Sequence, residues 1–546
     1  MPGAAGRRTC VLVGVAGSSR SFSLSLYNLK AYAYGDAEMR SAWDLQVIQH
    51  PLIGVDGLST RVAALAVQVV ARNPSLVALS CYMWNLDAFK ALSALLRVRL
   101  PGAMLVWGGP EISTDYVVAG RYDDLEADFL VSGEGERTFL ELLRHLSKGA
   151  PALPDIPGLS LRKRGPGPFT VNARRTPFKS LDEVPSPYLT GVVDDQVLQR
   201  DRVQANLETQ RGCNLRCSYC IYHKDMAQIS FSSVQRVMDE VTFVTNKGVR
   251  DIRFVDANFG SDLGYAKAVM RGLVERRFEA KLMFELIPGF IDEELAALFG
   301  AYNQLHAWND VTLGIGVQTT NLDVLRKVRR GIRVERFEET FDLVQRFQIY
   351  AKIDLIIGLP GEDLASIERT LEYMLAKLAG SRAHLLCCHV MRGLPGTELL
   401  DIANAHGMVF SSRYEPHELF ESPTLPRSDM VRCLRRTAVV FRLINHAGWA
   451  NQEFLSGRRS SASHIADAFF AARERLGVSH VAVVDLVVEA LMGHLEERGS
   501  HFVQPDFPFA ESWWWGQSRI EIEDEWLMEF LSSLQARRVL RPDVTA

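Results

Sequence analysis

Short apolar runs alternate with helical patterns along the first part of the chain. Each run is followed by a loop and, in most cases, by a segment with apolar residues at helical spacing. This alternation predicts an α/β fold with a doubly wound parallel sheet, whose ligands bind beyond the carboxyl ends of the strands. The runs that predict buried strands are residues 9–15, 45–49, 76–80, 104–107 and 129–132.

A second alternation of strand and helix extends from residue 201 to about residue 395 and predicts another α/β region. Between the two regions, a segment rich in Pro, Gly and Arg fits a linker with a small hairpin at the GPGP of residues 165–168. From about residue 412 the pattern is largely helical. The predicted units are a domain at 1–148, a linker at 149–200, a second domain at 201–400 and a helical C-terminal domain at 401–546.

The composition is that of an ordinary globular protein with several domains. With 546 residues, the chain is too long for one core. Its net charge is -4, and no basic stripe along the sequence indicates a nucleic-acid partner. No apolar segment reaches the length of a membrane span, and the apolar run near the N-terminus is too short for a signal sequence. Most of the eight cysteines are scattered, which is typical of a reducing compartment. We therefore expect a cytoplasmic protein.

Three cysteines lie close together in the segment RGCNLRCSYC, at Cys213, Cys217 and Cys220. Thiolates with this CxxxCxxC spacing on one tight loop bind three irons of a [4Fe-4S] cluster and leave the fourth iron open to a small chelating molecule. A structural zinc site is the alternative, and it needs a fourth ligand, for which His223 is available. Zinc knuckles usually combine paired CxxC units, so the spacing favours the iron–sulfur cluster.

The cysteine loop, with the strand-like run at residues 205–210 before it, resembles the cluster motif of radical S-adenosylmethionine (SAM) enzymes. The resemblance extends to about residue 395 and implies a partial (β/α) barrel in which SAM binds the open iron. The expected strands include residues 252–255, 281–286, 311–317 and 352–357. By position in this family, the residues that hold SAM are Tyr219, Glu285, Gln318, Thr319, Arg330 and the turn from Gly358 to Gly361. Structural roles are the alternative, such as a paired buried charge or a strand cap.

Small and polar residues follow the predicted strands of the N-terminal domain. Its glycines permit either close approach of the backbone to a ligand or simply tight turns, and the pattern alone favours neither. The segments VLVGV, SCYMWN, WGGPEIS and SGEGE resemble the cobalamin-binding domain that is found fused to radical SAM domains. The resemblance implies that these segments contact cobalamin, with Ser80, Tyr82, Gly108, Gly109, Gly133 and Glu134 as the candidates.

The N-terminal region lacks the DxHxxG motif, whose His ligates cobalt from below in the wider cobalamin family. Bound cobalamin is therefore expected in the base-off form, with water, nothing or a non-coordinating side chain at the lower face. Arg20 and Trp84 are the candidates for that side chain, because both lie at predicted strand ends. The plainer alternatives are an exposed loop cation for Arg20 and ordinary packing for Trp84.

Together, the resemblances imply a cobalamin-dependent radical SAM methyltransferase that acts on an unactivated carbon, or a phosphorus, of a small molecule of natural-product type. The implied cofactors are a [4Fe-4S] cluster, SAM and cobalamin, and the implied partners are the substrate and an external electron donor of the flavodoxin or ferredoxin type. One alternative is a non-methylating outcome, such as cyclisation, ring contraction or a heteroatom swap. Another is polar methylation of an electron-rich heteroaromatic ring such as indole. A non-catalytic sensor has no need of Gln318, Arg330 and the GLPGED turn together.

Overall fold

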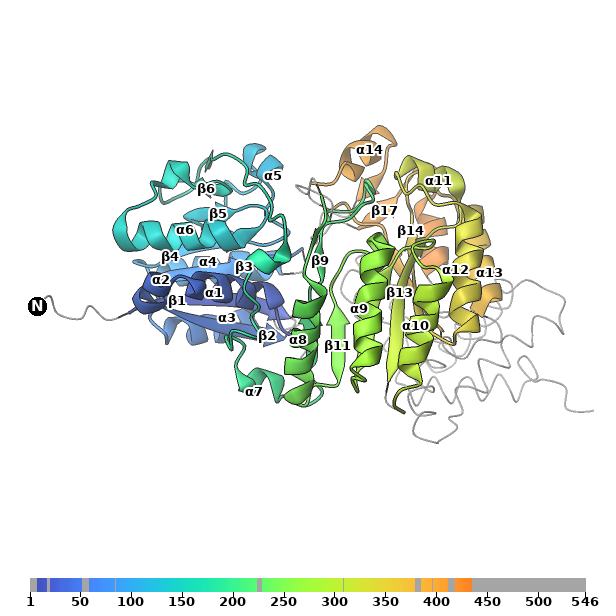
Figure 1. Ribbon diagram of the computed structural model, residues 1–546. Coiled ribbons are helices and arrows are strands. Elements are labelled where there is room, and N and C mark those ends of the chain that lie inside the picture. Colours follow the sequence, from blue (N-terminus) through green and yellow to red (C-terminus); the bar gives the residue numbers. More distant parts are fainter. Residues whose placement is uncertain are drawn as a thin grey trace, which may run out of the picture.

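The computed structural model shows two α/β units side by side (Figure 1). The residues it describes are 7–16, 20–51, 58–83, 85–222, 228–307, 309–378, 384–394, 396–410 and 418–434. Trp84, His223 and most of the predicted helical C-terminal domain lie outside these ranges. Of the helix expected in the region after residue 412, the chain is helical from residue 427 to the last described residue, 434.

The first unit is built on a sheet with the strand order β2-β1-β3-β4-β5-β6-β7. Its first five strands are parallel, as the alternation of strand and helix predicts. They are β1 (Arg8–Ala16), β2 (Trp43–Pro51), β3 (Leu76–Ser80), β4 (Met104–Gly108) and β5 (Phe129–Val131). The helices are α1 (Leu24–Gly35), α2 (Ala37–Ala42), α3 (Leu58–Val70), α4 (Leu86–Arg99), α5 (Thr114–Val118) and α6 (Gly135–Lys148).

Both faces of this sheet are covered by helices. Successive side chains of a strand point to opposite faces, so Val11 and Val13 of β1 pack in one core with α3 and α4. Cys10 and Leu12 pack in the other core with α1, α2 and α6. Because β1 to β5 are parallel, the loops at their carboxyl ends gather at one edge of the sheet.

A hairpin from the predicted linker extends this sheet. Its strands are β6 (Leu159–Leu161) and β7 (Thr170–Val171), and β6 pairs antiparallel with β5. Further along the linker, Phe178 and Tyr188 are each 1% exposed, and the short helix α7 (Asp195–Leu198) follows them. The connecting segment therefore packs against both units instead of running free between them.

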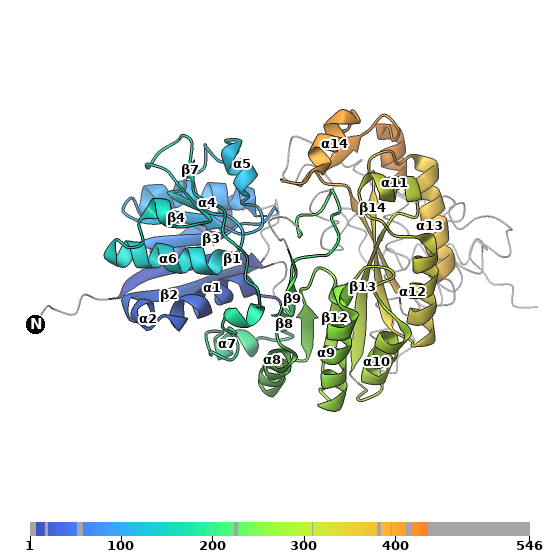
Figure 2. The ribbon, with the colours of Figure 1, turned by 45° about the horizontal axis from the view of Figure 1, so that its top comes forward.

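The second unit is an open barrel of six parallel strands in the order β15-β14-β13-β12-β11-β8. The strands are β8 (Gln204–Leu207), β11 (Asp251–Phe254), β12 (Lys281–Leu286), β13 (Asp310–Gln318), β14 (Tyr350–Ile357) and β15 (His384–Val390). Helices lie along its outer side (Figure 2). They are α8 (Val234–Asn246), α9 (Leu263–Glu275), α10 (Glu293–Asn303), α11 (Leu322–Lys327), α12 (Val334–Arg346) and α13 (Leu364–Leu378).

Along the barrel strands, buried and half-buried residues alternate. In β14 the residues Ala351, Ile353 and Leu355 belong to the hydrophobic core under the helices. The residues between them are only half-buried, so they line the inner face of the open barrel. Parallel strands of this kind place their functional residues at the carboxyl ends and on the inner face.

Smaller elements complete the second unit. The strands β9 (Gln210–Arg211) and β10 (Ser230–Phe231) pair antiparallel on either side of the cysteine loop. After the barrel come α14 (Leu399–Ala405), β16 (Val409–Phe410) and β17 (Leu419–Glu421). Within the described part of the chain, no helix is both long and apolar enough to span a membrane.

Candidate active site

The cysteine loop leaves the barrel directly after β9. Cys217 is 4% exposed, whereas Cys213 and Cys220 are half-buried, and all three thiols are free of disulfide bonds. The loop is anchored through Ser218, whose backbone N–H donates to Val328 O at 3.0 Å and whose carbonyl accepts from Leu399 N at 3.0 Å. The three thiols are therefore held on one short, fixed segment next to the carboxyl ends of the barrel strands.

The three thiols of the loop suit separate irons of one cluster and not a single metal ion. Among the described residues, no three His, Cys, Asp or Glu side chains converge closely enough to hold one metal ion. A [4Fe-4S] cluster does not need such convergence, because each thiolate binds a different iron. Burial raises the pKa of Cys213, and it raises that of Cys220 to about 11, which favours the protonated thiols. Because iron binds thiolates, binding of the cluster releases these protons.

Arg330 connects the cysteine loop to the barrel. Its guanidinium donates to the Tyr219 hydroxyl at 2.8 Å, lies 3.7 Å from Cys217 Sγ, and donates to the Gly316 carbonyl on β13. The residue is 5% exposed, and its Nε has no hydrogen-bond partner. A buried donor without a partner costs free energy, so an anionic ligand at this position fits the site.

Gln318 and Thr319 end β13 at a bulge in its pairing with β14. Gln318 has a φ of 69°, a strained value for a residue other than Gly, and its buried Oε1 has no partner. Thr319 is fully buried, with its hydroxyl 3.3 Å from that of Thr370. Gln318 thus offers an unsatisfied acceptor on the same strand that Arg330 contacts, which fits a hydroxyl or amino group of a bound ligand.

The predicted turn at Gly358–Gly361 has φ values of 88° and 85° at its two glycines. A Cβ at Gly358 would also collide with Leu419, whereas at Gly361 the near atom is the flexible end of Lys327, so the φ of Gly361 is what favours glycine there. Glu362 was missed by the sequence analysis, although it directly follows the turn. Its carboxylate accepts from the backbone N–H groups of Gly358 at 2.9 Å and Leu359 at 3.2 Å, and burial raises its pKa to about 7.

In the first unit, the predicted cofactor glycines differ in what surrounds them. A Cβ at Gly109 would collide with the backbone of Cys81, so this glycine serves the packing of two strand-end loops. At Gly108 a Cβ would make only an ordinary contact, 3.4 Å from the Val131 Cβ. Gly133 has a φ of 77° and open space around its Cβ position. The buried Ser132 Oγ next to it has no partner. The β5 end therefore fits a bound ligand best.

The end of β3 carries a group of hydroxyls. Ser80 is 7% exposed, and its Oγ lies 3.4 Å from Ser25 Oγ on α1. Burial raises the pKa of Tyr82. Asn85, which the sequence analysis did not single out, shapes this loop because its side chain accepts from Tyr82 N at 2.8 Å and donates to Ser80 O at 3.1 Å. The loop is held in one conformation, with its hydroxyls at the sheet edge.

Arg20 and Glu134 are both engaged with the second unit. Arg20 forms an ion pair with Asp251 at the start of β11 and donates to Arg202 O at 2.8 Å. Glu134 accepts from Arg211 at 2.9 Å and from the backbone N–H of Phe178 at 2.6 Å. In this structure the two residues join the units to each other, and their predicted contacts with cobalamin stay predictions.

Glu285, at the end of β12, accepts from Arg253 of β11 at 3.0 Å. The pair is partly exposed on the inner face of the barrel, with 27% of the Glu285 side chain accessible. The structure thus places Glu285 on the inner side of the sheet, and its predicted contact with SAM stays a prediction.

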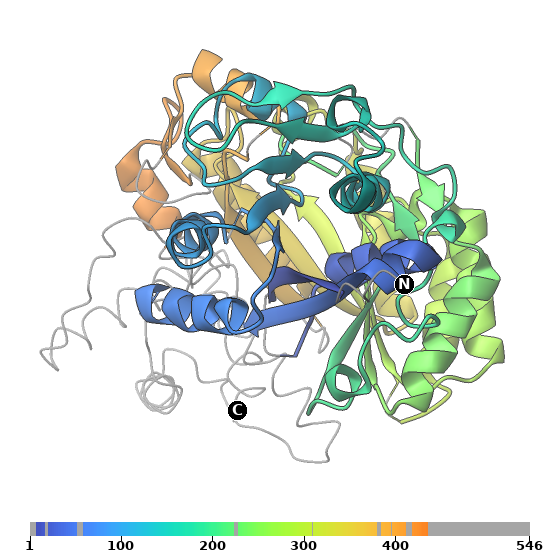
Figure 3. The same ribbon diagram turned by 90° about the vertical axis from the view of Figure 1, so that its left-hand side faces the viewer.

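The boundary between the units is built from buried charges. Arg211, two residues before Cys213, contacts Glu134 and Glu136 of the first unit and Glu208 of its own. In the view from the first unit, that unit stands in front of the barrel (Figure 3).

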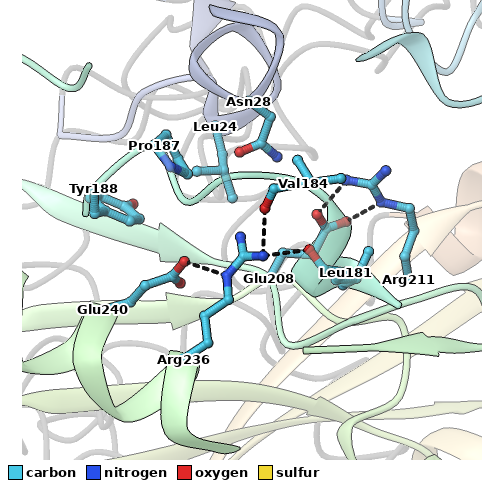
Figure 4. A pocket seen from close by; sticks show the side chains of 10 residues that line it. All are labelled: Leu24, Asn28, Leu181, Val184, Pro187, Tyr188, Glu208, Arg211, Arg236 and Glu240. Carbon is cyan, nitrogen blue, oxygen red and sulfur yellow. Dashed lines mark hydrogen bonds and ion pairs between the residues drawn. The ribbon is translucent and has the colours of Figure 1, made fainter. Parts of the chain in front are cut away.

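A small pocket lies beside Arg211 (Figure 4). It is lined by Leu24, Asn28, Leu181, Val184, Pro187, Tyr188, Glu208, Arg211, Arg236 and Glu240. Arg236 bonds within it to Glu240 and to the linker carbonyls, which makes this pocket part of the interface.

Comparison with known proteins agrees with these two sites. The family model described as Radical SAM superfamily matches residues 207–374, and the one described as B12 binding domain matches residues 39–143. The 2-(S-pantetheinyl)-carbapenam-3-carboxylate methyltransferase of Streptantibioticus cattleyicolor is 30% identical over 347 residues, which cover 61% of this chain and 48% of that protein. The chain spans about half the length of the curated relatives that it matches first.

Two solved structures share the arrangement of both units. The cobalamin-dependent S-adenosylmethionine radical enzyme OxsB, with aqua-cobalamin and SAM bound, aligns at a TM-score of 0.64 and 14% identity, covering 98% of this chain and 80% of that one. The radical SAM methyltransferase TsrM from Kitasatospora setae aligns at 0.57 and 18% identity, covering 74% and 77%. At these identities the likeness concerns the fold. Together with the two family matches, the cysteine loop and the glycine-rich strand ends show that the chain contains a radical SAM domain and a B12-binding domain, whose cofactors are a [4Fe-4S] cluster, SAM and cobalamin.

Proposed function

We propose that this protein is a cobalamin-dependent radical SAM methyltransferase that methylates an unactivated carbon, or a phosphorus, of a small molecule of natural-product type. The observation that carries the proposal is the contact of Arg211 with Glu134. Arg211 lies two residues before Cys213, and Glu134 follows Gly133 in the glycine-rich loop of the first domain. One ion pair therefore holds the loops of the two cofactor sites against each other.

When bound, the cluster and SAM supply one-electron chemistry and cobalamin supplies a methyl group. The residues of the chain bind and orient these groups. Arg330 Nε and Gln318 Oε1 are a donor and an acceptor without partners at the end of β13, and they suit the polar groups of SAM. The turn at Gly358–Gly361 is kept rigid by Glu362 and suits a flat ring against its backbone. In the first unit, Gly133 leaves space for cobalamin after β5.

The protein also needs an electron donor, and we propose a flavodoxin or ferredoxin in a reducing, cytoplasmic setting. This part of the proposal comes from the free cysteines and from the cluster, which requires one-electron reduction. The substrate is proposed to enter between the two units, on the inner face of the barrel, because both sets of strand ends open there.

The test is an anaerobic incubation of reconstituted full-length protein with methyl-labelled SAM, a reductant and candidate small molecules. We expect a product heavier by one methylene, together with S-adenosylhomocysteine and 5′-deoxyadenosine, each equal in amount to the product. Methylation without 5′-deoxyadenosine would replace the radical route with polar transfer. A changed product with no gain of a methyl group would contradict the methyltransferase proposal and favour cyclisation, ring contraction or a heteroatom swap. The protein in which all three loop cysteines are replaced by Ala is the control and should give none of these products.

A further inference from the structure

The inner face of the barrel carries a row of ionisable side chains, of which only Glu285 is also a candidate for a cofactor site. Arg253 lies on β11 and Glu285 on β12, while Lys352 and Asp354 lie on β14 and His389 on β15. All five occupy positions that alternate with core residues, so they face inward. Beside Glu285, Lys352 and Asp354, β13 contributes Gly314 and Gly316 on this face.

Strand register places these residues in one continuous band. Glu285 is in register with Gly314, and Gly314 is in register with Lys352. A Cβ at Gly314 would collide with the Glu285 carboxylate, so the missing side chain lets that carboxylate lie across β13 toward Lys352. One step further along the strands, Gly316 is in register with Asp354.

The charges alternate in sign along this band. Arg253 donates to Glu285 at 3.0 Å, Lys352 donates to Asp354 at 3.1 Å, and His389 Nε2 lies 3.1 Å from the other Asp354 oxygen. Lys352 and His389 hold the pKa of Asp354 below its ordinary value despite the burial of this carboxyl, and neighbouring carboxylates raise the pKa of Lys352. Apart from His389, the band has two positive groups, Arg253 and Lys352, and two negative groups, Glu285 and Asp354.

Several of the polar atoms are not used up by these contacts. The Lys352 ammonium has three N–H groups, of which the structure directs one to Asp354. Arg253 Nε is buried and has no partner. The side chains of Lys352 and His389 remain 24% and 34% exposed although they lie inside the barrel. Ion pairs in such positions add little to folding stability compared with apolar residues, so a folding role does not account for the band.

We propose that this band binds the dipolar end of the substrate, a part that carries both a carboxylate and an ammonium group. Lys352 receives the carboxylate, and the carboxylates of Glu285 and Asp354 on either side of Lys352 receive the ammonium group. A dipolar ligand offers an opposite charge both to Lys352 and to the two carboxylates, whereas a purely anionic or cationic ligand leaves one of these members opposed by a like charge. That the bound molecule is the substrate rests on the proposed function, whereas its binding can be measured without turnover.

The test measures binding to the full chain loaded with cluster and cobalamin, in the presence of SAM and without reductant. The probes are the twenty common amino acids, and for each one that binds, its carboxamide, which lacks the carboxylate, and its des-amino acid, which lacks the ammonium group. We expect at least one amino acid to bind 10-fold or more tightly than both of its singly charged relatives. The proposal is overturned if none does.

Variants of β14 then locate the site. Lys352→Met and Asp354→Asn should each weaken binding of the amino acid at least 10-fold and remove its advantage over the singly charged relatives, and Lys352→Arg should retain most of it. Lys247→Met, which removes a partly exposed lysine paired with Asp195 on the outside of the barrel, is the matched control and should bind as the unchanged protein does. Preference for the dipolar probe that survives Lys352→Met would overturn the proposal.

Cobalamin, iron and SAM binding of each variant serve as the check on folding. Because the variants avoid Glu285, which is also a candidate for SAM, an unchanged affinity for SAM separates this site from the cofactor site. A protein that binds the dipolar probe through Lys352 but methylates nothing would contradict the proposed function and leave this inference standing. Methylation of a substrate with no charged group would support the proposed function and contradict this inference.

Discussion

Arg211 Nη1 lies 2.9 Å from Glu134 Oε1, and this contact crosses from the radical SAM domain to the B12-binding domain. The same guanidinium also contacts Glu136 at 3.1 Å and Glu208 at 2.7 Å. Burial raises the pKa of Glu134, and Arg211 counteracts that effect by stabilising the carboxylate. One buried cation thus neutralises carboxylates from both domains, directly beside the cysteine loop.

Replacing Arg211 with Ala should therefore destabilise the protein strongly. Three carboxylates would be left without their cation in a largely buried place, which costs about 3–5 kcal/mol in comparable cases. The free energy of unfolding, measured by urea denaturation, tests this expectation. Arg326→Ala is the matched control, because Arg326 and Asp323 form an exposed pair on one helix, worth at most about 0.5 kcal/mol. A loss in Arg211→Ala no larger than in the control would contradict the structural role.

Replacing Cys213, Cys217 and Cys220 together with Ala should abolish the cluster. The three thiols are on one anchored loop, and a [4Fe-4S] cluster needs all of them, since each binds a separate iron. Iron content and visible absorbance after anaerobic reconstitution measure the effect. A second triple variant, with Cys387, Cys388 and Cys433 replaced, is the control and should keep its cluster. Four irons per chain in the first variant would show that other residues hold the cluster.

Cobalamin bound to the first domain should be base-off and without a histidine ligand. Neither the loop after β1 nor the loop after β3 contains a histidine, and the structure engages Arg20 with Asp251. Electron paramagnetic resonance of the Co(II) form checks this, because an axial nitrogen splits the signal. Nitrogen splitting would contradict the prediction. If the nitrogen splitting disappeared in His50→Ala, the axial ligand would be His50, which lies at the end of β2.

Stability should depend on pH through Glu362. Burial raises the pKa of this carboxyl from 4.5 to about 7 in the folded protein, so the folded state binds more protons than the unfolded state between these values. The contribution of Glu362 to stability is therefore full below pH 4.5 and is lost as the pH rises to about 7, at ~1.4 kcal/mol per pH unit. The measurement compares the free energy of unfolding with that of Glu362→Gln across this range. An identical pH dependence in both proteins would sink the idea.

The parallel strands were well predicted by their apolar runs. The runs at 76–80 and 281–286 coincide with β3 and β12, and the other strands differ by a few residues at their ends. The hairpin at GPGP was also expected, but its pairing with β5 was not. Turn residues act locally, whereas the choice of a partner strand depends on contacts between segments far apart in the sequence.

The candidate site shows the same division. The cysteine spacing and the Gly358–Gly361 turn are local patterns, and each carries its chemistry within a few residues of sequence. Arg211 and Glu362 could not be recognised in this way, because a buried charge is defined by the partners around it. The sequence therefore determined the two domains, the cofactor motifs and the order of the strands along the chain. Only the tertiary structure decided which charges meet, since Glu134 and Arg211 are 77 residues apart and become neighbours only when both domains pack together.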